Sequence, residues 1–169
     1  CENLTTVNIP STVSVINFHT FEYCLSLTNV TIGEGVFYIT SFAFDHCESL
    51  EGISLPSGIT KIDMYAFNHC TSLKSIVIPD GVYYIPSGTF RACESLESVT
   101  IPEGVQRIDN EAFAYCAKLK SVKIPSTVTS IGDEAFTGCS SIKSIAIPSG
   151  VTSIGICTFE NCSSLTSVT

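Results

Sequence analysis

Apolar and polar residues alternate along the chain in a pattern that repeats every 23 residues. Each unit follows C-x-x-L-x-x-[VI]-x-[IL]-P-x-x-[VI]-x-x-I-x-x-x-[AT]-F-x-x, and its first cysteine falls at 1, 24, 47, 70, 93, 116, 139 and 162. A fixed period of this length is typical of solenoids, whose units bury their apolar faces only by stacking on one another. The sequence therefore predicts one elongated stack of seven full repeats, with a partial repeat from residue 162.

Two apolar pairs in each unit predict two extended segments. The first pair is spaced by two residues and is mostly β-branched, which predicts a strand with one buried face. Proline follows this pair in most repeats, with Gly33 in its place in the second, and proline ends a hydrogen-bonded strand. The second pair, spaced by three, predicts a shorter extended segment. The spacing Phe-x-x-Cys-x-x-Leu predicts one tight helical or 3₁₀ turn that closes each repeat.

The unit L-x-x-I-x-I-P…V-x-x-I-G…A-F-x-x-C resembles the BspA-like, or treponemal-type, leucine-rich repeats. Residues 116–138, CAKLKSVKIPSTVTSIGDEAFTG, match that pattern nearly throughout, whereas Gly33 and Pro86 depart from it. The resemblance implies a right-handed leucine-rich repeat solenoid, mainly β, with the first strand of each repeat in a concave parallel sheet. It also implies a secreted or cell-surface protein that binds host matrix proteins or other cells.

The domain prediction is a single leucine-rich repeat solenoid over residues 1–169, with repeats starting at 1, 24, 47, 70, 93, 116 and 139 and a partial one at 162. Because both ends fall within the repeat pattern, we expect the chain to be a segment of a longer one. No apolar run reaches the roughly 18 residues of a membrane span, so we expect no membrane insertion.

The net charge of −8 disfavours nucleic acid as a partner. The charge is uneven: residues 1–60 carry six acids and no lysine or arginine, whereas residues 116–169 carry three acids and four lysines. Two interpretations are open, namely drift among surface positions and attraction between opposite ends of neighbouring molecules.

The regularly spaced cysteines could in principle form disulfides or bind a metal ion. However, side chains at identical positions of stacked repeats point in the same direction and do not converge. We therefore expect a ladder of buried thiols that act as small hydrophobic side chains. Cys157 lies outside this ladder and is a candidate exposed thiol, either reactive or incidental. His46 and His69 occupy equivalent places in adjacent repeats, yet zinc normally takes three or four ligands. We predict no metal site, no cofactor and no catalytic residues.

Binding surfaces remain. Phe37, Tyr38, Tyr83 and Tyr84 fill outward places beside the second apolar pair, with Lys61 and Arg107 at equivalent places in other repeats, and this set is a candidate protein contact. Small hydroxyl residues between the first-strand positions form a second, smoother strip. Three sequons, at Asn3, Asn29 and Asn161, are possible glycosylation sites.

Two functions fit these features. The first is a non-enzymatic protein-interaction or adhesion module, secreted or on a cell surface, whose partner is a host matrix protein or another cell surface. The second is a structural protein that assembles with itself head to tail into filaments or a surface layer.

Overall fold

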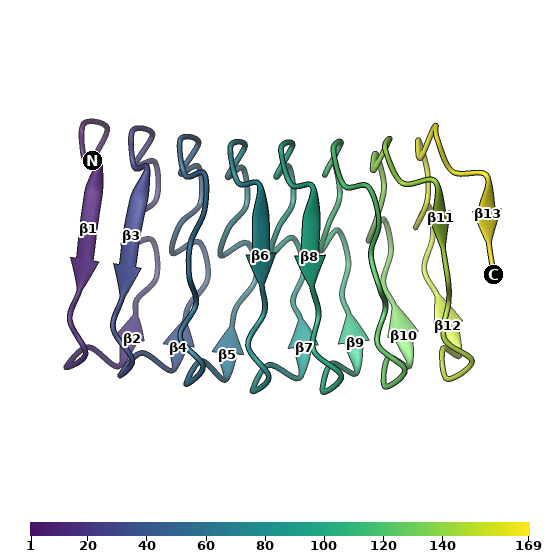
Figure 1. Cartoon of the computed structure of the whole chain (residues 1–169), viewed down its shortest axis with the longest axis horizontal. Coiled ribbons are helices and arrows are strands. Elements are labelled where there is room, and N and C mark those ends of the chain that lie inside the picture. Colours follow the sequence, from purple (N-terminus) through teal and green to yellow (C-terminus); the bar gives the residue numbers. More distant parts are fainter.

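The computed structural model describes residues 1–169, and Figure 1 shows a rod of stacked coils with a row of strands on each of two sides. We call these the first-strand row and the second-strand row. The first-strand row consists of β1 (Thr6–Ile9), β3 (Asn29–Ile32), β6 (Ser75–Val77), β8 (Ser98–Thr100), β11 (Ser144–Ile145) and β13 (Ser167–Val168). The second-strand row consists of β2 (Val15–Ile16), β4 (Tyr38–Ile39), β5 (Lys61–Ile62), β7 (Tyr84–Ile85), β9 (Arg107–Ile108), β10 (Ser130–Ile131) and β12 (Ser153–Ile154).

All strand pairs are parallel and join residues one repeat apart. Val7 pairs with Val30 in the first-strand row, and Ile85 pairs with Ile108 in the second. The solenoid and its period are therefore as the sequence predicts. The second extended segment is a strand in every full repeat, whereas the first is not a strand in the third and sixth repeats.

Proline and glycine determine where the hydrogen-bonded strand ladders extend and where they end. The longest pair, β1 with β3, includes a hydrogen bond of 2.8 Å from the Gly33 amide to the Ile9 carbonyl. Later repeats have proline at the Gly33 position, and proline has no amide hydrogen for this bond. Likewise the Asp63 and Asp109 amides each donate to the preceding repeat, but Pro86 between them cannot, and β5 does not pair with β7.

The first-strand row has two gaps. Residues 52–55 form no strand, and Gly52 makes only an isolated bridge to Ser75 of the next repeat. No strand or bridge of this row joins the second repeat to the third, or the sixth to the seventh.

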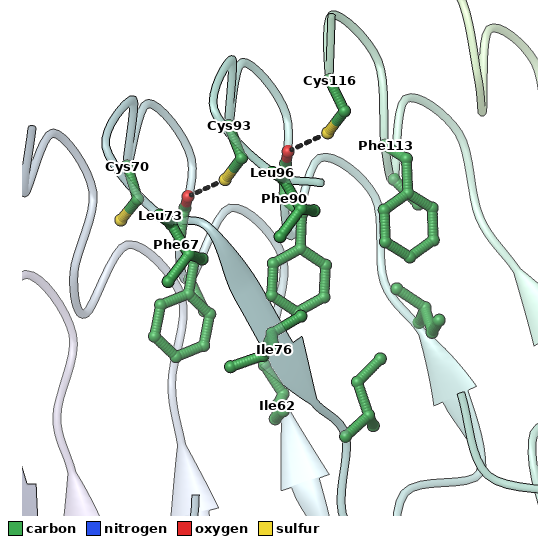
Figure 2. Packing of buried hydrophobic residues seen from close by; sticks show 14 of the residues in the cluster. Ile62, Phe67, Cys70, Leu73, Ile76, Phe90, Cys93, Leu96, Phe113 and Cys116 are labelled. Carbon is green, nitrogen blue, oxygen red and sulfur yellow. Dashed lines mark hydrogen bonds between the residues drawn. The ribbon is translucent and has the colours of Figure 1, made fainter. Parts of the chain in front are cut away.

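The core consists of columns of equivalent apolar side chains, one from each repeat. Figure 2 shows the phenylalanine column beside the leucine and cysteine columns in the middle of the stack. The rings of Phe67, Phe90 and Phe113 are fully buried and nearly parallel, with centroids 5.6 Å and 5.5 Å apart. Each repeat buries its apolar side chains only by packing against the neighbouring repeats, as in other solenoids.

The segment that closes each repeat differs from the prediction. We call it the turn edge, which covers residues 17–23 of the first repeat and the equivalent residues of the others. The structure contains no helix there, so the predicted helical or 3₁₀ turn is not confirmed. Two residues per turn edge, such as His19 (φ 57°) and Tyr23 (φ 54°), have the left-handed backbone conformation, which a right-handed helix does not accommodate.

Because of the left-handed residues, successive amide groups along the turn edge point alternately toward the next repeat and back into their own repeat. The amides of His19, Phe21 and Tyr23 donate to carbonyls of the next repeat. The amides between them, such as that of Glu22, donate back three residues within the same repeat. The turn edge is thus a third line of hydrogen bonds between repeats, and it runs beside the phenylalanine column.

Candidate interaction surface and side-chain clusters

The predicted contact residues lie together on the second-strand row. Tyr38, Lys61, Tyr84 and Arg107 come from four successive repeats and occupy equivalent positions, as the pairing of Tyr38 with Lys61 and of Tyr84 with Arg107 shows. The Lys61 ammonium lies 4.3 Å from the centroid of the Tyr38 ring, and the Arg107 guanidinium lies 5.2 Å from that of Tyr84. Each tyrosine therefore has a cation on its ring face.

Acidic residues two positions further along the chain hold these cations in place. Lys61 Nζ donates to the Tyr38 hydroxyl at 2.9 Å and lies 3.4 Å from Asp63, while the Tyr38 hydroxyl also donates to Asp63. Arg107 pairs with Asp109 through two nitrogens. Hydrogen bonding to Tyr38 raises the pKa of Lys61, and hydrogen bonding to Asp109 raises the pKa of Arg107. Both side chains are therefore charged at neutral pH and locally neutralised.

Phe37 and Tyr83 flank this column and point outward. Phe37 is 48% exposed and Tyr83 61% exposed, whereas Tyr38 and Tyr84 are half-buried beneath their cations. We call the six residues Phe37, Tyr38, Lys61, Tyr83, Tyr84 and Arg107 the second-strand patch. It combines fixed polar groups with two large exposed rings, a composition typical of protein contact surfaces.

The hydroxyl strip on the first-strand row contains a groove where the row is interrupted. The groove has a volume of about 470 Å³, lies between the second and third repeats, and is lined by Asn29, Thr31, Gly52 and Ser54 among others. Asn29, one of the sequon residues, is exposed in β3, and Asn3 and Asn161 are also exposed.

Two of the four lysines in the last repeats form ion pairs with acids of the repeats before them. Lys120 lies 2.5 Å from Glu97, and Lys123 lies 2.9 Å from Glu103. Lys118 and Lys143 form no ion pair. The uneven charge seen in the sequence is thus partly balanced within the chain.

The ladder cysteines are all free and make a contact that the sequence did not predict. From Cys47 onward, each ladder thiol donates to the carbonyl of the phenylalanine 26 residues earlier in the chain, as Cys93 does to Phe67 at 3.2 Å (Figure 2). Burial raises the pKa of these thiols, to about 12 for Cys47, so they stay protonated. The column therefore adds one S–H···O bond per repeat to its packing.

Cys157 is exposed at a left-handed position of the last turn edge. A hydrogen bond with Glu160, followed by the charge of that carboxylate, raises the pKa of Cys157. The thiol is thus accessible and mostly protonated at neutral pH.

The turn edges of the first three repeats hold two stacks of rings, of which only the His46 and His69 pair was identified from the sequence. His19, Phe42 and Tyr65 stack with centroids 5.1 Å and 5.2 Å apart, and Phe18 packs edge-on against Phe42 at 5.7 Å. The second left-handed position of these repeats holds another stack, Tyr23 on His46 at 4.5 Å and His46 on His69 at 4.4 Å. The signal was present as aligned aromatic residues, but that column mixes with Glu111 and Glu134 further along the chain.

Asp45 completes a cluster of potential metal ligands with His46 and His69. One ligand atom of each residue lies within 4.8 Å of the other two. The two histidines align in the sequence, but the carboxylate does not align with them, because Asp45 belongs to the neighbouring column, where other repeats have Asn68 or Arg91.

No element of the structure is a helix with the length and hydropathy needed to cross a membrane. The parallel strands, the 23-residue coil and the inward leucines together define a leucine-rich repeat solenoid. The chain belongs to the BspA-type leucine-rich repeat family, whose model matches residues 1–118 and 83–169 in six copies.

Solved structures similar to the chain are bacterial leucine-rich repeat proteins. A leucine-rich cell-surface protein from Faecalibacterium prausnitzii is 28% identical over 99% of this chain and 60% of its own, with a TM-score of 0.70. The T. pallidum leucine-rich repeat protein is 31% identical over 98% of this chain and 67% of its own, with a TM-score of 0.76. A leucine-rich repeat protein from Eubacterium ventriosum is 30% identical over 97% of this chain and 44% of its own, with a TM-score of 0.87. A search of the curated proteins finds no match.

Proposed function

We propose that the chain is a non-enzymatic protein-interaction module, secreted or displayed on a cell surface, and that the second-strand patch contacts its partner. The family supports an interaction role, and the F. prausnitzii relative is described as a cell-surface protein. The observation that carries the site is the pair of cation-on-tyrosine contacts, at 4.3 Å and 5.2 Å, flanked by exposed Phe37 and Tyr83. A matrix protein or a protein of another cell surface is the proposed partner.

The arrangement of the patch favours binding because its polar side chains are already held. Lys61 and Arg107 lose little rotamer freedom on binding, since Asp63 and Asp109 fix them in the free protein. The same acids cancel the positive charge, so aromatic area contributes more to affinity than charge does. Binding should therefore depend only weakly on salt concentration.

Surface plasmon resonance against a panel of purified matrix proteins and whole cells tests this proposal. The variant Phe37→Ser/Tyr83→Ser should lose most binding, because large central rings contribute most of the energy in such contacts. The control variant Phe18→Ser/Met64→Ser removes equally exposed apolar side chains from the turn edge and should bind like the wild type. Equal binding by both variants, with unchanged circular dichroism, would rule out the patch.

Head-to-tail assembly is a second candidate function, supported by the uneven charge. Residues 1–60 carry no lysine or arginine, and Lys118 and Lys143 in the last repeats have no ion-pair partner. Oppositely charged ends attract at low ionic strength, and salt screens this attraction. Sedimentation velocity in low and high salt tests the idea, and a chain that stays monomeric at high concentration in low salt contradicts it.

A further inference from the structure

Asp45, His46 and His69 form the only cluster of at least three potential metal ligands in the chain, with one ligand atom from each within 4.8 Å of the others. Asp45 and His46 come from the second turn edge and His69 from the third. The Asp45 side chain is nearly fully buried, and the two imidazoles are half-buried. The three residues thus join two repeats at a partly solvent-shielded place.

Polar atoms in this cluster lack the partners that burial normally demands. Asp45 forms no ion pair with lysine or arginine, and its contacts are His46 Nδ1 at 2.9 Å and Asn68 Nδ2 at 2.8 Å. His69 Nδ1 and Asn68 Oδ1 are buried and have no hydrogen-bond partner at all. Asn68 itself is only 7% exposed. Because unpaired buried polar atoms are uncommon and destabilising, the cluster is chemically incomplete as it stands.

We propose that Asp45, His46 and His69 bind one divalent transition-metal ion of the zinc class. One carboxylate and two imidazoles are a ligand set that suits zinc, with water or a neighbouring polar atom as the fourth ligand.

Binding requires a local rearrangement of the aromatic stack. The His46 and His69 rings lie 4.4 Å apart and only 7° from parallel, so their in-plane lone pairs run side by side rather than converging. Both rings must tilt to share one ion, which weakens the contact of Tyr23 with His46 at 4.5 Å. The chain has no tryptophan, so a change in tyrosine fluorescence reports this tilt.

The nearby ladder thiols are not part of the proposed site. Cys47 and Cys70 are each next to a histidine in sequence, but their thiols donate to the Phe21 and Phe44 carbonyls. The ion instead links the second and third repeats at the turn edge, the same two repeats that no strand or bridge joins in the first-strand row. Metal should therefore raise the thermal stability of the chain.

Titration of the tag-free chain with Zn²⁺ and with Co²⁺ tests the site. We expect one ion per chain by calorimetry, a rise in Tm with added Zn²⁺, and Co²⁺ absorption bands of four-coordinate nitrogen and oxygen ligands without a thiolate charge-transfer band. Asp45→Asn and His69→Asn should each weaken binding about tenfold or more. Asparagine suits the left-handed backbone of residue 69, since Asn161 occupies the equivalent position with φ 57°.

The matched control is His19→Asn, which removes the remaining histidine at another left-handed position and should leave binding unchanged. Cys157→Ser, which removes the exposed thiol outside the ladder, should also bind like the wild type. The proposal is overturned by the absence of saturable binding, by unchanged affinity in His69→Asn with a native Tm, or by a thiolate band that Cys157→Ser abolishes. It stands or falls independently of partner binding by the second-strand patch.

Discussion

The turn edges of repeats 1–3 and of repeats 5–7 share one backbone conformation but carry different kinds of side chain. Both halves place two left-handed residues in each repeat, with φ between 53° and 72°. In repeats 1–3 these positions hold rings, namely His19, Phe42, Tyr65, Tyr23, His46 and His69. In repeats 5–7 they hold Glu111, Glu134, Cys157, Tyr115, Gly138 and Asn161.

This difference shows how the repeat separates folding from surface chemistry. A left-handed conformation costs a non-glycine residue about 1–2 kcal/mol. Most of these positions in both halves are not glycine, so most of them carry this conformational cost. In repeats 1–3 stacked rings offset part of this cost, at about 0.5–1.5 kcal/mol per aromatic pair. In repeats 5–7 glycine at 138 and asparagine at 161 reduce it instead. The packed core determines the backbone conformation, whereas the side chains of the turn edge can differ from repeat to repeat.

The largest expected effect is the loss of stability when a core phenylalanine is removed, and it tests whether the cores of the two halves are packed equally well. Phe44 and Phe136 are both fully buried and stacked on two sides. Phe44→Ala and Phe136→Ala should each lower the free energy of unfolding by about 3–5 kcal/mol in urea denaturation. Phe159→Ala, which loses one ring contact only, should cost less. Clearly unequal losses for Phe44 and Phe136 would show that the halves differ in the core as well.

An intermediate effect is expected at Gly88, where the two kinds of turn edge meet. Gly88 has φ +62°, and a Cβ atom there would lie 2.1 Å from the Tyr65 ring. Gly88→Ala should lower stability by about 1–3 kcal/mol, through backbone strain and displacement of that ring. Thermal denaturation measures the loss.

Two matched variants separate the causes. Gly52→Ala should be nearly neutral, because a Cβ atom at Gly52 meets nothing within 4 Å. Adding Gly88→Ala to Tyr65→Ala should cost less than adding it to the wild type, since only backbone strain then remains. Equal costs in both backgrounds would mean that Tyr65 does not constrain this position.

The smallest effect concerns the thiols and leaves stability unchanged. The seven buried ladder cysteines should resist iodoacetamide in the native state. Cys1, the first ladder cysteine, is exposed rather than buried as predicted, and it should react, as should Cys157. The thiolate is the nucleophile, and Glu160 raises the pKa of Cys157, so its alkylation should be slow at neutral pH and speed up as pH rises past 9. Glu160→Gln should lower that pKa and increase the rate at pH 8, as read by mass spectrometry. An unchanged rate would exclude Glu160 as the cause.

Much of the fold could be predicted from the sequence because the period aligns chemically equal residues. Phe90, Cys93 and Leu96 recur with their equivalents in every repeat, so their columns and the parallel ladders follow from alignment alone. The turn edge could not be predicted in this way. Residues such as Tyr23 and Phe42 seldom adopt positive φ, and the clearest signals of that conformation are Gly88, Gly138 and Asn161.

The candidate sites were predictable to different degrees for the same reason. Tyr38, Lys61, Tyr84 and Arg107 occupy one column, so their proximity followed from the alignment, although the cation-on-ring geometry did not. The Asp45 carboxylate reaches His46 from a neighbouring column. Contacts between columns depend on side-chain rotamers, which periodicity does not determine.

The alternating amides of the turn edge also limit the electrical polarity of the rod. At the ends of the strands in the second-strand row, amides of a later repeat donate to carbonyls of an earlier one, as Thr40 does to Ile16. Along the turn edge the order is reversed, as in the bond from Phe21 to Ala43. Peptide dipoles on the two sides therefore point in opposite directions along the axis and partly cancel. In an α-helix the same dipoles are aligned and sum along the axis. A stack built this way can gain repeats without building up a matching potential difference between its ends.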